Sequence, residues 1–172
     1  GILQMVNHGL STGALFLIVG MIYERRHTRD IEAFGGLWKV MPVYAVLTLI
    51  VALSSMGLPG LNGFVGEFTI LLGAFGSEAI GSYWFAGLSA LGVILAAVYM
   101  LFMFQKMFLG PLDKAENKEL KDINWREILT LVPLLILIFW IGLYPKPFFD
   151  LMGPSVEHLV EAINAAAVVS LP

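Results

Sequence analysis

Long apolar blocks separated by short charged segments dominate the pattern along this chain. Blocks 1–22 and 83–105 contain no Asp, Glu, Lys or Arg, and both exceed the roughly 20 residues that an α-helix needs to cross about 30 Å of hydrocarbon. Block 127–143 is shorter and has Pro133 near its start, where a missing N–H costs least. Each block is typical of a membrane-spanning helix.

The apolar block 40–76 is far too long for one straight crossing at about 1.5 Å per residue. Its middle, Met56-Gly57-Leu58-Pro59-Gly60-Leu61-Asn62-Gly63, cannot continue a regular helix. The block is therefore either a hairpin of two crossings or one crossing made of two half-helices, with a hinge at Gly57, Pro59, Gly60 and Gly63. Together the four blocks predict an all-α, polytopic transmembrane helical bundle of about four crossings.

The distribution of basic residues distinguishes the two topologies of block 40–76. Nine of the ten Lys and Arg residues lie in loops 23–39 and 106–126, and only Lys146 lies beyond them. If block 40–76 crosses once, both basic loops lie on the cytoplasmic side, as the positive-inside rule requires. The sequence therefore favours a single, broken crossing. Its freed backbone groups would be buried in protein or line a wet cavity, with a packing kink or an ordinary hairpin turn as the alternative.

The composition agrees with a membrane protein and excludes several kinds of site. Hydrophobic residues make up 58% of the 172 residues and charged residues 13%, against about half and a quarter in soluble domains. The absence of cysteine rules out disulfides, thiolate metal sites and iron–sulfur ligation by this segment. A nucleotide-binding glycine loop, a His-x-x-x-His pair, a Ser-His-Asp set and a basic nucleic-acid patch are also missing. We therefore expect no metal and no catalytic redox centre in this chain.

The two ends of the chain differ in character. The first residues lack an initiator Met and run directly into an apolar block, so we expect the C-terminal part of a longer protein and no signal peptide. Residues 1–150 are interpreted as the transmembrane helical region. Residues 151–172 are interpreted as a surface tail, in which a short amphipathic helix could begin near Pro154.

Glu67 is the strongest candidate for chemistry. It lies a few residues beyond the break, with no Lys or Arg within 20 positions on either side. An acid at the centre of a spanning helix costs about 2.5–3.5 kcal/mol on insertion scales. Because hydrocarbon disfavours the charged carboxylate, such a group can bind a proton and release it again during transport. The competing interpretation is a helix-end glutamate that reaches the interface.

His8 is the second candidate. Gln4, His8 and Ser11 share one helix face in an otherwise apolar block, and a histidine passes a proton through its two nitrogens. A single membrane histidine also serves as hydrogen-bonding contact between helices. A proton relay and a structural contact therefore both remain open for His8.

Five stretches then carry a resemblance to a known family: Asn7-His8-Gly9-Leu10, Tyr23-Glu24-Arg25-Arg26-His27-Thr28-Arg29, Gly35-Gly36-Leu37-Trp38, Gly57-Leu58-Pro59-Gly60 and Phe64-Val65-Gly66-Glu67-Phe68. Together they resemble the subunit M (chain 4) family of proton-translocating NADH-quinone oxidoreductase, respiratory complex I. The resemblance covers nearly the whole chain and implies the last third of an antiporter-like subunit with a broken helix. Most antiporter-like relatives have a lysine shortly after the break, so Glu67 points to the subunit M type.

The resemblance implies a function and a set of partners. It implies proton translocation driven by NADH oxidation and quinone reduction in partner subunits, which would hold the NADH, FMN, iron–sulfur clusters and quinone. Glu67 would be the terminal protonatable group of a half-channel, and His8 would belong to the polar axis that leads to it. Neighbouring antiporter-like subunits and the lipid bilayer would be the partners, in a bacterial cell membrane or an equivalent organelle membrane. No nucleic acid is expected.

Two other functions remain as alternatives. The chain could belong to a multisubunit cation/proton antiporter without redox partners, although the glutamate at position 67 counts against this. It could also be a purely structural membrane anchor, in which the break serves only packing and neither Glu67 nor His8 takes part in transport.

Overall fold

The chain folds into a bundle of roughly parallel and antiparallel helices. The computed structural model describes residues 1–77 and 83–169, and the described residues contain no strand. The α-helices are α1 (Ile2–Arg26), α2 (Pro42–Ser55), α3 (Asn62–Phe75), α4 (Tyr83–Phe104), α5 (Ala115–Lys118), α6 (Trp125–Leu143) and α7 (Lys146–Val169). Short turns of 3₁₀-helix lie at η1 (Ile31–Ala33) and η2 (Leu37–Lys39), and α4 continues into a π-helical turn, η3 (Gln105–Leu109).

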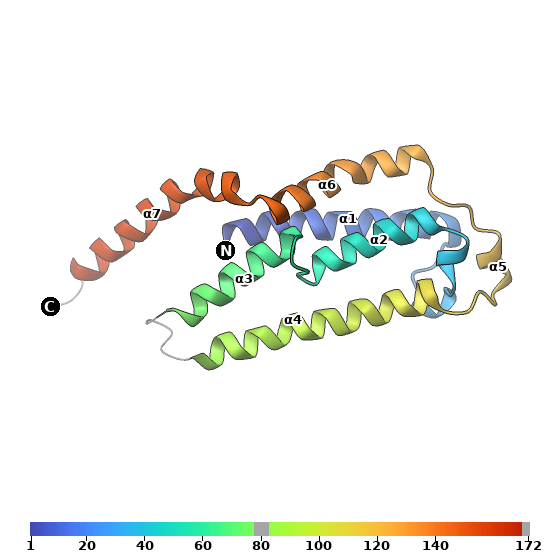
Figure 1. Ribbon diagram of the computed structural model, residues 1–172, viewed down its shortest axis with the longest axis horizontal. Helices are drawn as coiled ribbons and strands as arrows, with labels where there is room; N and C mark the ends of the chain where they lie inside the picture. Colours follow the sequence, from blue (N-terminus) through green and yellow to red (C-terminus); the bar gives the residue numbers. More distant parts are fainter. Residues whose placement is uncertain (78–82, 170–172) are drawn as a thin grey trace.

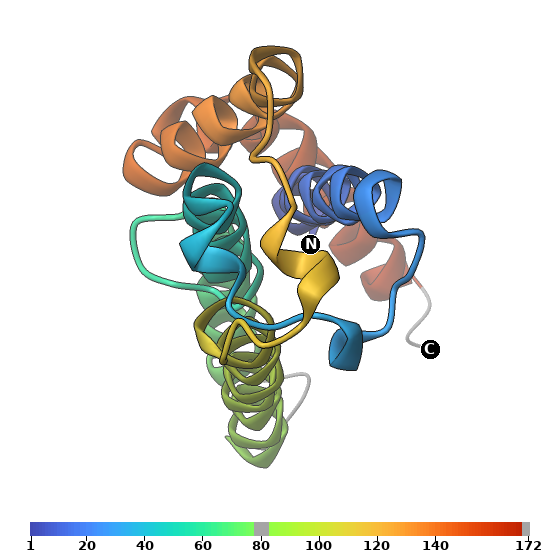
Figure 2. The same ribbon diagram turned by 90° about the vertical axis from the view of Figure 1, so that its right-hand side faces the viewer.

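Block 40–76 forms one crossing made of two half-helices. Figure 1 shows α3 continuing in the direction of α2, while α1 and α4 run the opposite way beside them. Seen from the end, α2 and α3 lie one behind the other (Figure 2). In the described part of the chain, three helices are long and apolar enough to cross a membrane: Ile2–Arg26, Tyr83–Leu109 and Trp125–Leu143. The predicted all-α bundle with one broken helix is confirmed.

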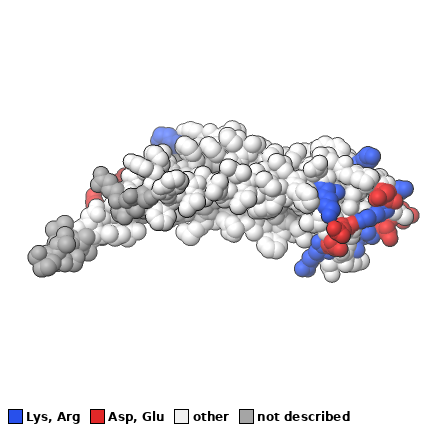
Figure 3. Space-filling model, turned by 90° about the horizontal axis from the view of Figure 1, so that it is seen from below, with Lys and Arg blue, Asp and Glu red and all other residues white. Residues whose placement is uncertain are grey.

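The charged loops all lie at one end of the bundle, as the count of basic residues predicted for a single broken crossing. Most of the Lys, Arg, Asp and Glu side chains visible in Figure 3 gather at this end, where η1, η2 and α5 lie in Figure 1. The long flank between the two ends is almost free of charge on the face shown. This is the surface pattern of a protein surrounded by lipid.

Helix α6 begins with a capping box formed by Asn124 and Glu127. The Asn124 side chain accepts hydrogen bonds from the backbone N–H groups of Arg126 and Glu127, at 2.9 and 3.1 Å. The Glu127 carboxylate accepts in return from the Asn124 N–H, at 2.7 Å. These bonds satisfy orphan donors of the first turn and fix where the helix starts.

A hydrophobic core of α1, α2, α6 and the connecting segments lies toward the charged end of the bundle. The largest fully buried side chains include Leu37, Met41, Tyr44, Phe108 and Leu131. The Tyr44 hydroxyl donates to the Ile18 carbonyl at 3.0 Å, and so ties α2 to α1. This packed layer holds the first half-helix rigidly, which gives the break beyond it a fixed support.

The C-terminal helix differs from the sequence prediction. A short helix was expected to begin near Pro154 inside a tail of residues 151–172, but α7 begins at Lys146 and runs through Pro154 to Val169. The Pro145 carbonyl accepts from the N–H groups of Phe148 and Phe149, at 3.0 and 3.2 Å, and so starts the helix early. Pro147 is tolerated there because its missing N–H falls in the first turn. The helix therefore crosses the boundary that was placed at residue 150.

Candidate functional site

The break between α2 and α3 is closed by a regular helix-ending motif. The N–H of Leu58 donates to the Leu53 carbonyl at 3.0 Å, and the N–H of Gly57 donates to the Ser54 carbonyl at 3.3 Å. This pair of bonds is the Schellman motif, which satisfies the last carbonyls of a helix around one left-handed residue. Gly57 supplies that residue with φ of 76°. The backbone polar groups that end α2 are therefore largely satisfied without water.

Two further glycines let the chain turn back into α3. Gly60 has φ of 93°, a conformation that L side chains rarely adopt. At Gly63 a side chain would collide with the Ser54 carbonyl, so α3 starts in direct contact with the end of α2. The sequence predicted a hinge at Gly57, Pro59, Gly60 and Gly63. The structure places the first three between α2 and α3 and Gly63 in the first turn of α3.

Glu67 lies one turn beyond this break and turns back over it. A Cβ added at Gly57 would collide with the Glu67 Oε2 atom, which shows how closely the carboxylate covers the turn. The side chain is half-buried. Within residues 1–77 and 83–169, no Lys, Arg or His side chain forms an ion pair with it. The carboxylate is thus held by shape and not by a counter-charge.

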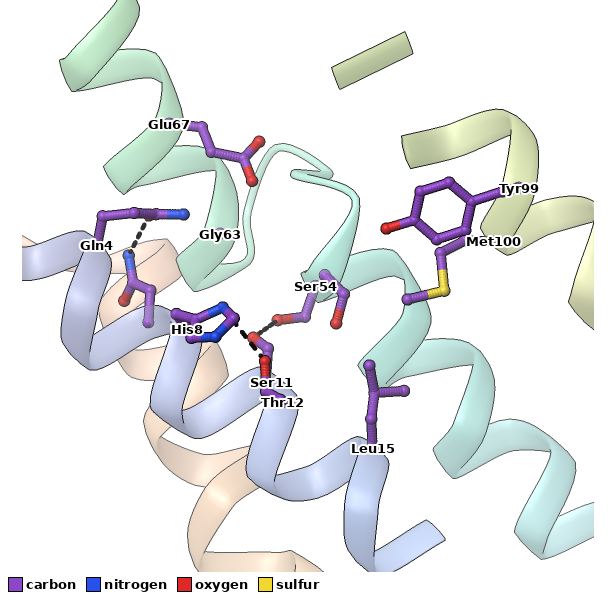
Figure 4. A pocket seen from close by; sticks show the side chains of 12 residues that line it. Gln4, His8, Ser11, Thr12, Leu15, Ser54, Gly63, Glu67, Tyr99 and Met100 are labelled. Atoms are coloured by element: carbon purple, nitrogen blue, oxygen red, sulfur yellow. Dashed lines mark hydrogen bonds between the residues drawn. The ribbon is translucent and has the colours of Figure 1, made fainter. Parts of the chain in front are cut away.

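A cavity of about 170 Å³ lies under the Glu67 carboxylate, between α1, the break and α4. Figure 4 shows its walls: the polar side chains come from α1 on one side and the break on the other. The polar residues that line it include Gln4, His8, Ser11, Ser54, Glu67 and Tyr99. A polar cavity of this size has room for several water molecules. It therefore joins the two candidates of the sequence analysis through one wettable space.

His8 is oriented by its own helix. Its Nδ1 atom lies 3.3 Å from the Thr12 Oγ1 atom, one turn further along α1. In Figure 4 the imidazole lies on the α1 wall between Gln4 and Ser11, while Glu67 lies across the cavity on α3. Gln4, His8 and Ser11 thus share the cavity as their spacing predicted. No hydrogen bond joins His8 to Glu67 directly among the described residues.

The α1 and α3 helices meet closely beside Glu67. At Gly66 an added Cβ would collide with the Gln4 Oε1 atom and would lie 2.7 Å from the Asn7 Nδ2 atom. The absence of a side chain at Gly66 therefore lets the Gln4 amide lie against α3. As a result, the polar face of α1 contacts α3 at Gly66, the residue that precedes Glu67.

A buried polar cluster joins α1, the end of α2 and the start of α3. It was not predicted from the sequence. Asn62 and Ser54 are fully buried, and Asn7 and Ser11 nearly so. The Asn7 Nδ2 atom donates to the Asn62 carbonyl at 2.7 Å, and the Ser54 hydroxyl donates to the Asn62 Oδ1 atom at 2.5 Å. The signal in the sequence was four small polar residues inside apolar blocks, but nothing in their spacing shows that they meet.

Comparison with known proteins identifies the family of the chain. A model of the family described as NADH:quinone oxidoreductase/Mrp antiporter, TM, matches residues 1–96, which is more than half of the chain. The chain belongs to this family. Residues 1–96 include His8, the whole break and Glu67, so the candidate site lies entirely inside the matched part of the family.

Relatives and solved structures of the family agree with this assignment. The chain is 44% identical to NADH-quinone oxidoreductase subunit M of Rhodobacter capsulatus over 95% of its length. It is 41% identical to NADH-ubiquinone oxidoreductase chain 4 of Arabidopsis thaliana over 93%. Its fold matches a chain of respiratory complex I from Thermus thermophilus with a TM-score of 0.75 and 37% identity, over 85% of this chain and 30% of that chain. A chain of an archaeal membrane-bound sulfane sulfur reductase also matches, with a TM-score of 0.76 and 27% identity, over 90% of this chain and 30% of that chain.

The relatives confirm the resemblance to the subunit M family and show what part of it is present. The chain spans 31% of the Rhodobacter capsulatus relative and 32% of the Arabidopsis thaliana relative. It is an integral membrane segment of the antiporter-like kind.

Proposed function

We propose that this chain is part of a proton-translocating membrane subunit of NADH-quinone oxidoreductase. Glu67 is the group that takes up and releases the proton. The observation that carries the proposal is the placement of this acid: it lies on a broken helix, over a polar cavity shared with His8, with no cation paired to it in the described chain.

The physical basis is the freedom of an unpaired carboxyl. A carboxylate bound to Arg or Lys is stabilised in its charged form and gives up its charge reluctantly. Among the described residues Glu67 has no such partner, so a change of charge on a neighbouring group can tip it between the protonated and ionised forms. The cavity supplies the path, because water between His8 and Glu67 can pass a proton in short steps. His8 serves as the donor or acceptor on the α1 side.

The energy for this transfer comes from partner subunits. We propose that NADH, FMN, iron–sulfur clusters and quinone are bound by those partners, and that other antiporter-like subunits lie next to this chain in the membrane. The support is that relatives 40–44% identical to this chain are NADH-quinone oxidoreductase subunit M proteins, and that its fold matches a chain of respiratory complex I. The chain itself acts without a redox centre.

The test is Glu67→Gln in the intact complex, because glutamine keeps the size and polarity of the side chain but cannot bind the proton in the same way. We expect assembly and NADH oxidation to persist while fewer protons are translocated per electron. Glu116→Gln, an exposed acid on α5, is the matched control and should leave this ratio unchanged. A normal ratio in assembled Glu67→Gln complex would overturn the proposal.

A second candidate function comes from the family itself, whose description includes the Mrp antiporters. In a cation/proton antiporter the same cavity would exchange protons for a cation without redox partners. The discriminating measurement is proton flux in vesicles with and without sodium, in the absence of NADH. Cation-dependent flux that continues without NADH oxidation would favour the antiporter.

A further inference from the structure

The buried polar cluster at the break contains a closed ring of hydrogen bonds. The Ser54 hydroxyl donates to the Asn62 Oδ1 atom at 2.5 Å, so its single proton is already used. The Ser11 hydroxyl, 2.7 Å from the Ser54 hydroxyl, must then be the donor of that pair. The Asn62 Nδ2 atom donates to the Ser11 oxygen at 3.4 Å and closes the circle. We call these three residues the Asn62 ring.

The Asn62 ring joins three segments that are far apart in the sequence. Ser11 lies on α1, Ser54 in the last turn of α2 and Asn62 at the start of α3. Two more bonds reinforce it: the Asn62 Nδ2 atom donates to the Asn7 carbonyl at 3.3 Å, and the Asn7 Nδ2 atom donates to the Asn62 carbonyl at 2.7 Å. All four side chains are at least 95% buried, and Asn7, Ser11 and Ser54 also border the cavity under Glu67.

The ring is unsuited to carry protons and well suited to hold the break. Every hydroxyl proton in it points to the next member, and the amide of Asn62 neither gives up nor accepts a proton readily near neutral pH. A proton entering from the cavity would therefore meet a ring of neutral groups whose hydroxyl protons are already donated within the ring. The same closed bonding fixes the end of α2, the start of α3 and the wall of α1 to one another.

We propose that Asn62 is a positioning residue for proton transfer at Glu67, and this rests on the proposed function. Asn62 begins the half-helix that carries Glu67, a little more than one turn before it. The ring fixes that first turn against Ser11 and Ser54, and this sets the place of the Glu67 carboxylate over Gly57 and the cavity. Without the ring, α3 keeps its helical structure and the Asn7 bond to the Asn62 carbonyl, but its first turn is no longer tied to the side chains of Ser11 and Ser54.

The test replaces Asn62 by leucine, which fills a similar space and cannot bond to the serines. Three variants are compared in the intact complex: Asn62→Leu, Glu67→Gln, and Thr48→Val as the matched control. Thr48 is equally buried on α2, but its hydroxyl donates to the Tyr44 carbonyl of its own helix. The measurement is the number of protons translocated per electron, normalised to assembled complex and compared with the rate of NADH oxidation.

We expect Asn62→Leu to lower the ratio of protons to electrons to the level of Glu67→Gln, with NADH oxidation retained and Thr48→Val unchanged. A loss of assembly alone would lower proton flux and NADH oxidation together and leave the ratio of protons to electrons unchanged. A normal ratio in Asn62→Leu while Glu67→Gln is impaired overturns the positioning role and leaves the proposed function standing. A normal ratio in Glu67→Gln overturns the proposed function and, with it, the role of Asn62.

A covalent replacement of the ring keeps the proposal testable if Asn62→Leu fails to assemble. The chain has no native cysteine, and the two serine oxygens are 2.7 Å apart, so Ser11→Cys with Ser54→Cys places two thiols within reach of a disulfide. We expect Asn62→Ala in this background to assemble and pump after oxidation and to lose pumping after reduction. Equal pumping in the oxidised and reduced forms, with the disulfide verified, would contradict the positioning role.

Discussion

An acidic side chain has different surroundings at the charged end of the bundle and at the break near Glu67. At the charged end, Glu127 forms two hydrogen bonds to the Arg25 guanidinium, at 2.6 and 2.7 Å. Arg25 also donates to the Lys121 carbonyl at 3.0 Å, so the pair ties α1 to α6 and to the loop before it. At the break, Glu67 has no such partner among the described residues and is placed by glycines and neutral amides.

The difference fits the proposed role of Glu67, because the two regions hold an acid by different means. A bidentate Arg–carboxylate pair fixes both geometry and charge, which suits a structural tie at the charged end. A counter-charge stabilises the ionised form of an acid, so an acid without one becomes protonated at a smaller cost in free energy. Neutral hydrogen bonds and close backbone contacts set a position without stabilising one protonation state.

The largest expected effect is at Gly57. The variant Gly57→Ala places a methyl group where the Glu67 Oε2 atom lies and puts an L side chain at φ of 76°. We expect proton translocation per electron to fall as far as in Glu67→Gln, because the carboxylate must leave its place. The control is Gly73→Ala on α3, where an added Cβ meets nothing within 4 Å. Equal ratios in the two alanine variants would refute a close contact between position 57 and Glu67.

The next largest effect is expected at Arg25, and of a different kind. Arg25→Ala leaves Glu127 without its partner in a pair whose side chains are only 18% and 16% exposed. We expect a loss of about 2–4 kcal/mol in stability, visible as a lower thermal transition of the purified complex. The number of protons per electron in the remaining complex should stay normal. A fall in that ratio at unchanged stability would break the distinction between the two regions.

A smaller effect is expected at Asp122. Its carboxylate accepts from the backbone N–H groups of Val43 and Tyr44, at 2.8 and 3.0 Å, and so caps α2 from a distant loop. Asp122→Ala should cost about 1 kcal/mol, as the loss of a helix cap usually does. Asp122→Asn should retain more of this stability, because its amide oxygen still accepts a hydrogen bond. Thermal unfolding of the two variants should therefore rank alanine below asparagine.

The smallest effect is expected at the surface pair of Lys106 and Glu32. The Lys106 Nζ atom lies 3.1 Å from the Glu32 Oε1 atom, but the side chains are 41% and 77% exposed. An exposed pair of this kind contributes about 0.5 kcal/mol or less. Lys106→Met should leave both thermal stability and proton translocation within error. A clear loss of proton pumping in Lys106→Met would mean that charge at this end also takes part in transport.

The sequence predicted the fold through features that are local or that add along the chain. Apolar block lengths gave the crossings, the glycines and Pro59 located the break, and the positions of Lys and Arg selected a single broken crossing. The start of α7 was missed because Pro154 looked like the first residue of a helix, whereas Pro145 and Lys146 already begin one. Proline limits where a helix can begin without stating which of several prolines begins it.

Glu67 and His8 were found from the sequence because an ionisable residue in an apolar block is rare and costly. That Glu67 turns back over Gly57, and that one cavity joins it to His8, came only from the tertiary structure. Asn62, Ser54 and Ser11 carry no charge. Ser11 shares a helix face with Gln4 and His8, but nothing in the order of the three residues along the chain shows that they form a ring. Pairing between distant neutral groups depends on how helices pack, and packing is decided by the whole bundle.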